Sequence, residues 1–423
     1  MSLTSFVKRQ ITSVRQGGRV VLLHKMKRMV MEGFKLPLFV LAIPVVVIIR
    51  VIRPFILIRF GELMSYRIGH FAANTELYFC ERDAGINVPK QRYIDLFSLI
   101  KPISNKQLER MWRRILLIWP RGILLQVLRV NRLIPGGYEH EVGNNTQHDR
   151  DVYNLFDRFP SHLQFTLEEE SLGNTGLRSL GVPEGVPFVC LNVRDSAYFG
   201  FDLGYHSYRD SDIQNYILVA EGLANRGYYV IRMGAKVQEA MKSNHPWVID
   251  YAANGKRSDF MDIYLGAKCH FAISTGTGWD AVPTIFHRPV CYVNFAPIGY
   301  IPTWHNQLLS ICKHHFSSSK GREMSLSEIF TEGVGFCLQT STYESKGVQL
   351  IDNTPEEIRD VAFEMADRLS CSWQSDEDDD MHQQRFWEVF PIDAVGTNGN
   401  PLHGAVRARF GSSFLRNNQW WLQ

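Results

Sequence analysis

Short apolar runs alternate with helical patterns between Phe188 and Pro297. The apolar runs are FVCLNVR, YYVIRMG, VIDYA, HFAISTGTG and VCYVNF, and helical spacing begins near Asp212 and again at Asp259. Such alternation predicts parallel strands, and parallel pairing gathers loops and helix N-termini at the carboxyl ends of the strands. We therefore predict a Rossmann-like sheet in this segment, with an edge suited to a phosphorylated ligand.

The chain before this sheet shows a weaker version of the same pattern. Phe55 to Phe60 predicts a buried first strand, and the residues after it predict a loop that enters a helix. From Asn87 to Ile134 the spacing predicts helices, interrupted by Pro102 and Pro120. This part of the chain is therefore interpreted as a separate first domain with one predicted strand and several helices.

Polar punctuation marks the boundaries further along. Pro135 to Asp151 is rich in Gly and Asn, which predicts a loop. Thr166, with Glu169 three positions later, predicts a capping box that opens a helix. Val182 to Pro187 holds two prolines and a glycine just before the second sheet, so we interpret it as the interdomain linker.

Two helices are predicted near the C-terminus. Thr354 is placed as the cap of the first, with Pro355 at its first position. The acidic run Asp376 to Asp380 predicts a solvated turn between the two helices. The chain is thus predicted to have four parts: an N-terminal basic and apolar segment (1–54), a first domain (55–181), a second domain that contains the parallel sheet (182–350), and C-terminal helices with a tail (351–423).

Positive charge is concentrated at the N-terminus. Residues 1–35 carry eight Lys or Arg against Glu32 alone, so this segment is +7 and the remainder −4, within a net charge of +3. An uncharged run of thirteen residues, Pro37 to Ile49, follows. Because a spanning helix needs ~20 apolar residues, the pattern favours a helix that lies in the headgroup region of an anionic membrane surface. A true span, a buried hairpin and a cleaved signal peptide are the alternatives.

Composition limits the class of protein. A chain of 423 residues with 45% hydrophobic residues can bury two cores, which excludes a disordered protein or a small disulfide scaffold. The seven cysteines form no CxxC pair, and several lie inside apolar runs. They are therefore expected to be reduced core thiols in a cytoplasmic environment.

The segment Ser274, Thr275, Gly276, Thr277, Gly278 carries the first candidate chemistry. It follows an apolar strand and precedes a helical pattern that Pro283 limits. Two glycines allow a ligand to approach the backbone, and the hydroxyls and amides can bind a pyrophosphate. The segment is neither GxGxxG nor GxxxxGK[ST], which disfavours a dinucleotide oxidoreductase or an ATPase. A tight turn without a ligand is the alternative.

Polar residues also follow the other predicted strands of this sheet. An arginine at such an edge can pair with phosphate in a fork geometry that lysine does not offer. The connection after the first of these strands is long and aromatic, and long loops at this edge usually carry function. The candidate donor-binding residues of this group are Arg194, Asp195, His206, Arg209, Arg232, Gly234, Ser258 and Asp259.

Several longer motifs occur in a particular order. A strand ending in VRD is followed by HSYRDSDIQNY, ANRGYYVIRMG and SDFMDIYLGAKCHFAISTGTGWDAVPTIFHRPV. RIGHFAANTELYF, HDRD, FTLEEE and RARFGSSFLRNNQWWL belong to the same order. Over most of residues 55–423 the chain thereby resembles a bacterial glycosyltransferase family associated with surface-polysaccharide synthesis. The resemblance implies a GT-B-like α/β fold, with two Rossmann-like domains facing a cleft.

The resemblance also implies an activity. The expected reaction moves a sugar from a nucleotide-sugar donor to a lipid-linked or polysaccharide acceptor, at the cytoplasmic face of the inner membrane. Arg194, Arg232 and the amides of Ser274 to Gly278 would hold the donor diphosphate without a metal or other cofactor, and would offset charge on the leaving group. Two alternatives stay open. One is a transferase of pyruvyl, glycerophosphate or phosphosugar groups, and the other is a non-catalytic subunit of a glycan assembly complex.

Candidates for the catalytic base follow the first predicted strand. His70 and Glu76 are titratable residues at its loop end, and either can accept a proton from an acceptor hydroxyl. Arg150 is a candidate for binding an anionic sugar or lipid phosphate of the acceptor. No hydrolytic Ser/His/Asp arrangement, zinc motif or nucleic-acid surface is indicated.

A metal-binding DxD motif is the competing plan. Literal matches are Asp149 to Asp151, Asp210 to Asp212 and Asp378 to Asp380. A metal-binding DxD should follow an apolar strand, whereas a polar loop, a helix start and an acidic run surround these three. The sequence therefore disfavours this plan.

Overall fold

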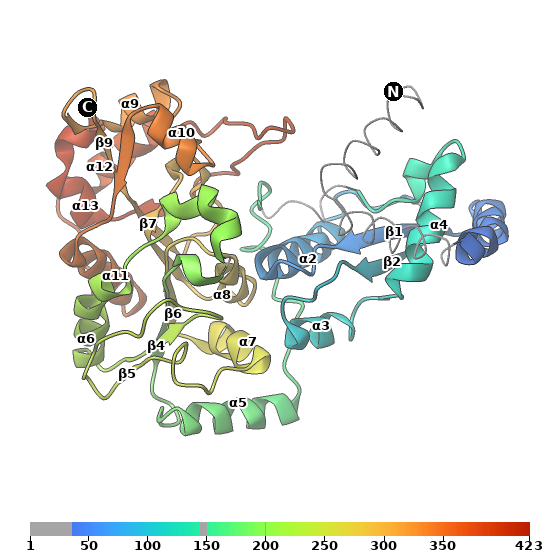
Figure 1. The fold of residues 1–423 in the computed structure, drawn as a ribbon, viewed down its shortest axis with the longest axis horizontal. Helices are drawn as coiled ribbons and strands as arrows, with labels where there is room; N and C mark the ends of the chain where they lie inside the picture. The colour runs from blue at the N-terminus through green and yellow to red at the C-terminus, as the bar shows by residue number, and fades with distance from the viewer. Residues whose placement is uncertain (1–35, 144–149, 199) are drawn as a thin grey trace, which may run out of the picture. The chain divides into compact units, whose positions relative to one another are not determined.

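A computed structural model describes residues 36–143, 150–198 and 200–423 (Figure 1). The chain forms two compact units, each built from several segments. The smaller unit contains the described residues up to Leu63, together with Pro89–Ile100 and Leu116–Gly143. The larger unit contains Met64–Val88, Lys101–Ile115 and the described chain from residue 150 onward.

The smaller unit is built on two parallel strands. β1 (Leu57–Leu63) pairs with β2 (Tyr93–Leu99) in a register that sets Arg59 opposite Asp95. These two side chains form a buried ion pair, with Arg59 Nη2 2.6 Å from Asp95 Oδ2. The sheet shares the unit with α4 (Arg121–Leu133) and the short η1 (Gly137–His140).

The prediction of helices throughout Asn87–Ile134 was wrong for β2. The run YIDLFSLI has apolar residues at spacings that suit a helix or a strand, so periodicity alone does not decide its structure. Pairing with β1 along its whole length decides for a strand. Helices do follow in this stretch, at α3 (Lys106–Trp112) and α4.

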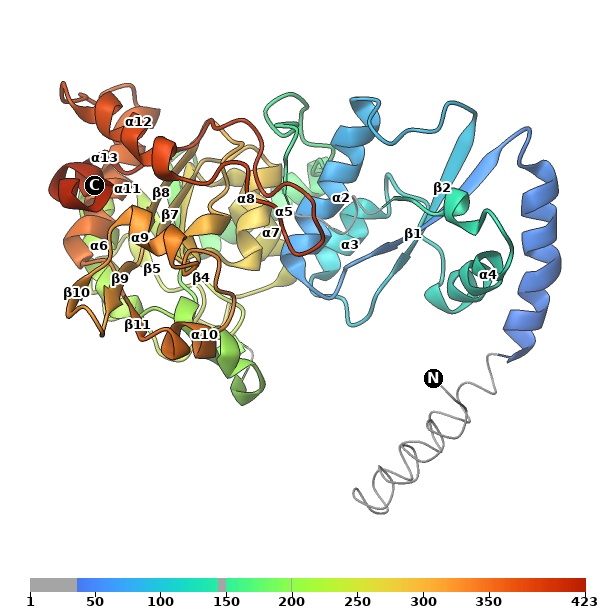
Figure 2. The same ribbon diagram turned by 90° about the horizontal axis from the view of Figure 1, so that it is seen from above.

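The first described element is a helix over residues 36–52. A stripe of Ala42, Val46 and Ile49 is buried in a cluster that includes Leu124 and Val127 of α4, and Figure 2 shows the two helices beside each other. The other faces of the helix leave large apolar side chains in solvent. No helix in the described ranges is long and apolar enough to cross a membrane, and the basic residues 1–35 lie outside those ranges. The exposed apolar side chains of the helix over residues 36–52 are Leu36, Leu38, Val40, Leu41, Ile43, Val45, Val47, Ile48 and Val51.

The larger unit contains a parallel sheet of seven strands. Their order is β12-β8-β7-β6-β3-β4-β5, and every pairing is parallel, so the predicted α/β fold with parallel strands is confirmed. The arrangement of two Rossmann-like domains around a cleft stays a prediction. The strands are β3 (Phe188–Asn192), β4 (Tyr229–Met233), β5 (Val248–Ile249), β6 (Phe271–Ser274), β7 (Val290–Phe295), β8 (Leu308–Cys312) and β12 (Arg409–Phe410).

The strand order contains a reversal. From β3 the chain builds outward through β4 and β5, and it then returns to add β6, β7 and β8 on the other side of β3. Open parallel sheets bind ligands at the carboxyl ends of the strands where the order reverses. The ends of β3 and β6 are therefore the expected site, and these ends lead into Arg194 and the segment 274–278.

Helices cover both faces of this sheet. α6 and α11 lie on one side of the central strands and α7 and α8 on the other (Figure 1). The capping boxes predicted at Thr166 and Thr354 are both present. The helices are α2 (Ile68–Asp83), α3, α5 (Leu167–Ser179), α6 (Ile217–Asn225), α7 (Asp259–Lys268), α8 (Ala281–Ile285), α9 (Leu326–Thr331), α10 (Thr340–Ser345), α11 (Pro355–Leu369), α12 (Asp379–Val389) and α13 (Ser412–Asn417).

Short elements complete the larger unit. β9 (His314–Ser317) lies between β10 (Arg322–Glu323) and β11 (Val348–Ile351) in a small antiparallel sheet. All seven cysteines are free, and all but Cys371 are buried, as expected for core thiols. The 3-10 helices are η3 (Ser196–Tyr198), η4 (Gly200–Arg209), η5 (Ile213–Tyr216), η6 (Gly278–Asp280), η7 (Ile298–Tyr300) and η8 (Gln419–Leu422).

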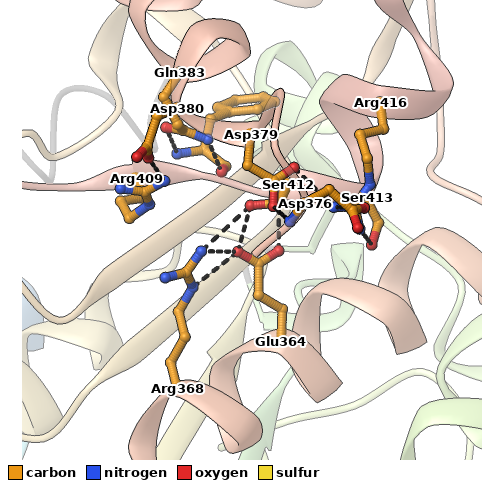
Figure 3. Close-up of polar contacts among 11 residues, drawn as sticks. Glu364, Arg368, Asp376, Asp379, Asp380, Gln383, Arg409, Ser412, Ser413 and Arg416 are labelled. Atoms are coloured by element: carbon orange, nitrogen blue, oxygen red, sulfur yellow. Dashed lines mark hydrogen bonds and ion pairs between the residues drawn. The ribbon is translucent and has the colours of Figure 1, made fainter. Parts of the chain in front are cut away.

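Charged side chains of the C-terminal segment form a network of hydrogen bonds and ion pairs (Figure 3). Glu364 of α11 is fully buried, and it accepts hydrogen bonds from Arg368 and from the backbone N–H of Ser412. Asp379 is only 1% exposed and binds Arg416 at 2.7 Å. The acidic run was predicted to lie between two helices, but only its first three residues do, because α12 begins at Asp379. The prediction of a solvated turn was also wrong for Asp379, because Arg416 of α13 binds it.

Candidate functional site

The segment after β6 is a rigid loop. Gly276 has a φ of 77°, and a Cβ there would lie 2.8 Å from the ring of Phe295, so glycine is required on both counts. Asp280 binds the loop from inside, because its carboxylate accepts hydrogen bonds from Ser274 Oγ and from the backbone N–H of Thr277. Burial raises the pKa of Asp280 to about 6.

The three hydroxyls of this loop are used within the protein. Ser274 Oγ donates to Asp280, Thr275 Oγ1 accepts from the backbone N–H of Arg194 at 3.0 Å, and Thr277 Oγ1 accepts from Asn192. Ser274 and Thr275 are also fully buried. The prediction that these hydroxyls face a phosphate is therefore corrected. The same correction applies to three of the loop amides: the N–H of Thr275 donates to the carbonyl oxygen of Asn192, that of Gly276 to Ser274 Oγ, and that of Thr277 to Asp280. The residues of the loop that line a cavity are Gly276, Thr277 and Gly278.

The N-terminus of α2 lies against this loop. A Cβ on Gly69 would come within 2.9 Å of both Cα and O of Gly278, so the two backbones are in contact. A 16-residue helix that begins here directs the positive end of its dipole toward the loop. His70, in the first turn of this helix, lines the same cavity, and its Nδ1 lies 3.4 Å from Asn74 Oδ1.

Two further cationic groups come from η4. Arg209 donates from Nη2 to the carbonyl oxygen of Gly276, while its buried Nε has no hydrogen-bond partner among the described residues. Burial, and then the nearby charge of Arg194, lower the pKa of Arg209. Burial also lowers the pKa of His206, as do the charges of Arg209, Arg194 and Arg67. The positive charges here repel one another, which favours an anionic ligand.

These groups surround a cavity of about 620 Å³, which we call the loop cavity. It lies in the larger unit, at the carboxyl ends of β6 and β7. Its polar lining combines the backbone of residues 276–278 with side chains from α2 and η4. The lining includes Gly69, His70, Ala73, Leu77, Glu81, Arg150, Tyr153, His206, Tyr208, Arg209, Asp280, Tyr292, Phe295, Tyr300 and Trp304.

A second cavity, of about 590 Å³, opens at the ends of β3 and β4, and we call it the acidic cavity. The predicted donor ligand Arg232 lines it, but its side chain is only 1% exposed. Arg232 Nη1 lies 3.0 Å from Asp250 Oδ2 and 2.6 Å from the carbonyl oxygen of Glu239. Arg232 and the loop at 274–278 therefore line different cavities. The acidic residues of this lining are Asp195, Asp210, Asp212, Glu239 and Asp352.

Arg194 lines neither cavity but interacts with one residue of each. Its Nε is 3.3 Å from Oδ1 of Asp210, which lines the acidic cavity, while its charge acts on Arg209 of the loop cavity. Asp195 is occupied within the protein, because its carboxylate accepts from the backbone N–H groups of Ala197 and Gln238. Gly234 directly follows β4.

Ser258 and Asp259 line neither of these cavities. Ser258 caps α7 by accepting from the backbone N–H of Met261. Asp259 Oδ2 accepts from the backbone N–H of Lys106 at 2.9 Å, which ties α7 to α3. Both side chains therefore form hydrogen bonds at the start of α7, and the sequence pattern had also placed these residues at a helix start.

The two predicted bases occupy different surroundings. His70 lines the loop cavity, whereas Glu76 is 1% exposed and accepts hydrogen bonds from His162. Arg150 lines the loop cavity as well, but its guanidinium donates to the carbonyl oxygens of Leu402 and Tyr300 and lies 4.7 Å from the ring of Trp304. His70 and Arg150 thus both line the loop cavity, and Arg150 also holds two backbone carbonyls; a role of either residue in catalysis or acceptor binding stays a prediction.

Sequence reasoning missed three charged residues of this site. Arg67 precedes α2, Glu81 lines the loop cavity, and Asp280 organises the loop. Asp280 could have been found, because it stands three positions after Thr277 in a capping-box pattern. Arg67 and Glu81 carry no such signal.

The DxD runs are occupied in other ways. Asp151 accepts from two backbone N–H groups, Asp212 caps η5, and Asp379 binds Arg416. Asp149 lies outside the described residues. Within the described ranges, none of these runs belongs to a group of three side chains with metal-ligating atoms close together.

Comparison with protein-family models gave no match, and neither did comparison with curated proteins. Solved structures do match. A family 9 glycosyl transferase from Veillonella parvula DSM 2008 is 12% identical with a TM-score of 0.44, and the match covers 75% of this chain and 99% of that one. The E. coli ADP-heptose LPS heptosyltransferase II is 14% identical with a TM-score of 0.43, and the match covers 74% and 98%. Both are glycosyltransferases by name.

Proposed function

We propose that the protein is a glycosyltransferase whose nucleotide-sugar donor binds at the carboxyl edge of the seven-stranded sheet. One observation carries the proposal. Arg209, His206 and the N-terminus of α2 converge on the backbone of residues 276–278, at the point where the strand order reverses. A diphosphate is a ligand that this combination of cations and a helix N-terminus suits.

The two cavities would divide the donor by chemistry. The diphosphate would lie in the loop cavity, where Arg209 and the N-terminus of α2 offset the charge that develops on the leaving group. The carboxylates of the acidic cavity, such as Asp352 and Asp212, are acceptors for hydroxyl donors such as those of a ribose. Arg194, which is paired with Asp210, would lie between the two parts of the ligand.

His70 is the residue that we assign as base, in preference to Glu76. An Nδ1–H donated to Asn74 would make Nε2 the atom that accepts the proton of the acceptor hydroxyl. Glu76 is bound by His162 and lines no part of the loop cavity. Replacing His70 with Gln should lower turnover by ~10²-fold or more with donor affinity unchanged, and near-normal turnover would sink the assignment.

The donor site can be tested by binding. UDP-, GDP-, dTDP-, CMP- and ADP-linked sugars would be screened by thermal shift, and the best would be titrated by calorimetry. Arg209→Gln should weaken its binding ~10- to 100-fold, because a charge-assisted hydrogen bond is worth ~1.5–3 kcal/mol. Arg359→Gln is the matched control, since Arg359 forms an ion pair with Asp360 on α11. Equal affinity in wild type and Arg209→Gln would eliminate this site.

Other reactions on the same fold stay as the second candidate. Transfer of a pyruvyl, glycerophosphate or phosphosugar group would use a different donor, so the same screen separates it from sugar transfer. A non-catalytic subunit would bind none of these donors.

We also propose that the helix over residues 36–52 attaches the enzyme to an anionic membrane surface, at the cytoplasmic face of the inner membrane. Its exposed side chains are almost all apolar, and the preceding 35 residues carry eight cations. Truncation is a poor test, because Ala42, Val46 and Ile49 belong to a core. Leu41→Asp with Ile48→Asp should abolish flotation with phosphatidylglycerol vesicles, whereas Leu218→Asp on α6 should not. Flotation that survives the double substitution would contradict attachment through this helix.

A further inference from the structure

A second group of reactive side chains lies on a different face of α2. Glu76 and Cys80 are one helical turn apart and both are 1% exposed. His162, from the segment that leads into α5, meets them: its backbone N–H donates to Glu76 Oε1 at 3.0 Å, and its Nδ1 lies 2.8 Å from the same oxygen. The imidazole stacks on Phe79, with ring centroids 4.9 Å apart, which holds the orientation of the ring.

The ligand atoms of this group are close together. One atom each from Glu76, Cys80 and His162 lies within 4.8 Å of the other two, and no other such trio occurs among the described residues. Glu76 Oε2 is buried without a hydrogen-bond partner there. A buried carboxylate oxygen without a donor is costly, which indicates that something else satisfies it.

The other nitrogen of His162 has a carboxylate partner. Its Nε2 lies 2.9 Å from Asp83 Oδ2, one helical turn beyond Phe79. A metal-bound histidine usually donates its second N–H to such a carboxylate, which fixes the tautomer and directs the other nitrogen at the ion. In that tautomer, Nδ1 and Glu76 Oε1 would be two facing acceptors 2.8 Å apart, an arrangement that a cation between them would stabilise.

We propose that Glu76, Cys80 and His162 form a binding site for a divalent cation of the zinc class. A set of one carboxylate, one thiolate and one imidazole is typical of Zn²⁺, which takes three protein ligands and a fourth from water or another group. Cys80 would bind as the thiolate and release its proton on metal binding. The competing interpretation is a metal-free one, in which a protonated His162 bridges Glu76 and Asp83.

The place of the site in the fold suggests what the ion would do. It would join α2 to the segment before α5, both in the larger unit. Another face of α2 carries Gly69, His70 and Glu81 into the loop cavity. The ion would therefore anchor the helix that presents His70, without touching the donor.

Metal binding can be measured directly on the full chain. The protein would be stripped with a chelator and titrated with Zn²⁺, and separately with Co²⁺ as a spectroscopic probe. We expect one ion per chain, a higher melting temperature on loading, and a near-ultraviolet thiolate-to-cobalt band. Cys80→Ser should remove the band, and Cys371→Ser, at an exposed cysteine, should retain it.

Two more variants separate metal binding from simple hydrogen bonding. His162→Gln keeps a donor for Glu76 and should still lose the ion, whereas Asp83→Asn should weaken Zn²⁺ affinity ~10- to 100-fold as an orienting partner. A chain that takes up neither ion, or a cobalt band that survives Cys80→Ser, overturns the proposal. Donor binding measured in parallel keeps this result distinct from the fate of the proposed function.

Discussion

Two cavities open at the carboxyl edge of one parallel sheet, and they differ in how their charges are used. In the acidic cavity the charged groups have partners within the protein: Arg232 binds Asp250, and Asp352 lies 2.8 Å from Lys313 Nζ. In the loop cavity the cations crowd together, and the charge of Arg194 lowers the pKa of both Arg209 and His206. An anion would reduce the repulsion between cations in the loop cavity, whereas in the acidic cavity it would meet mostly carboxylates.

The difference shows that an arginine at a strand end is not by itself a phosphate ligand. Arg194 follows β3, and Arg232 is the last residue but one of the neighbouring strand β4. Their surroundings nevertheless differ. Arg232 is enclosed by Asp250 and a carbonyl oxygen. Arg194 is paired with Asp210, but its charge also acts on Arg209 and His206. The identity of the neighbours decides the role.

The largest expected effect comes from Arg232→Met. Because Arg232 is buried and paired, its loss should lower the free energy of unfolding by about 3–5 kcal/mol, while donor affinity of the folded protein stays within ~3-fold. Urea unfolding and calorimetry would measure the two quantities. Arg359→Met, which breaks an ion pair with side chains about one-third exposed, should cost less than ~1 kcal/mol. If Arg232→Met abolishes donor binding and leaves the free energy of unfolding unchanged, Arg232 binds the donor and is not a structural residue.

A smaller effect is expected from Gly69→Ala, which tests the contact between α2 and the loop. Its Cβ would lie 2.9 Å from backbone atoms of Gly278, so the helix or the loop must shift. We expect a loss of ~1–3 kcal/mol and weaker donor binding.

Gly122→Ala is the control for this change. It places a Cβ on α4 with no atom within 4 Å, so it should be neutral or stabilise by up to ~1 kcal/mol. If Gly69→Ala and Gly122→Ala have the same melting temperature, close packing of Gly69 against Gly278 does not contribute to stability.

Much of the second sheet could be predicted from the sequence, because its strands are short apolar runs bounded by polar turns. The strand β2 could not, since its apolar spacing also suits a helix and only pairing with β1 decides. Helix caps such as Thr166 and Thr354 were predictable because the motif is local.

The site was predictable only in outline. The segment 274–278 and Arg209 could be placed at the sheet edge, but the use of the three hydroxyls within the loop depends on Asp280, Asn192 and Arg194. Likewise, burial of Glu76 depends on His162, which is 86 positions away. Contacts between distant segments leave no periodic signal in the chain.

The smallest expected effect is a pH dependence of donor binding. Burial and three arginines hold the pKa of His206 below its usual value. A bound diphosphate would favour the imidazolium and raise that pKa, so the complex takes up a proton that the empty site does not. Affinity should therefore increase as the pH falls through the pKa of the complex, and level off below the pKa of the empty site.

A nucleotide-sugar is the suitable probe, because its diphosphate is esterified at both ends and does not titrate near neutrality. Between pH 7.5 and 5.5 we expect Kd to fall by ~3- to 10-fold, since one unit of pKa difference corresponds to a factor of ten. His206→Gln should remove this slope and leave the Kd at pH 7.5 nearly unchanged. If the slope persists in His206→Gln and disappears in His70→Gln instead, the diphosphate lies nearer to α2 than to η4.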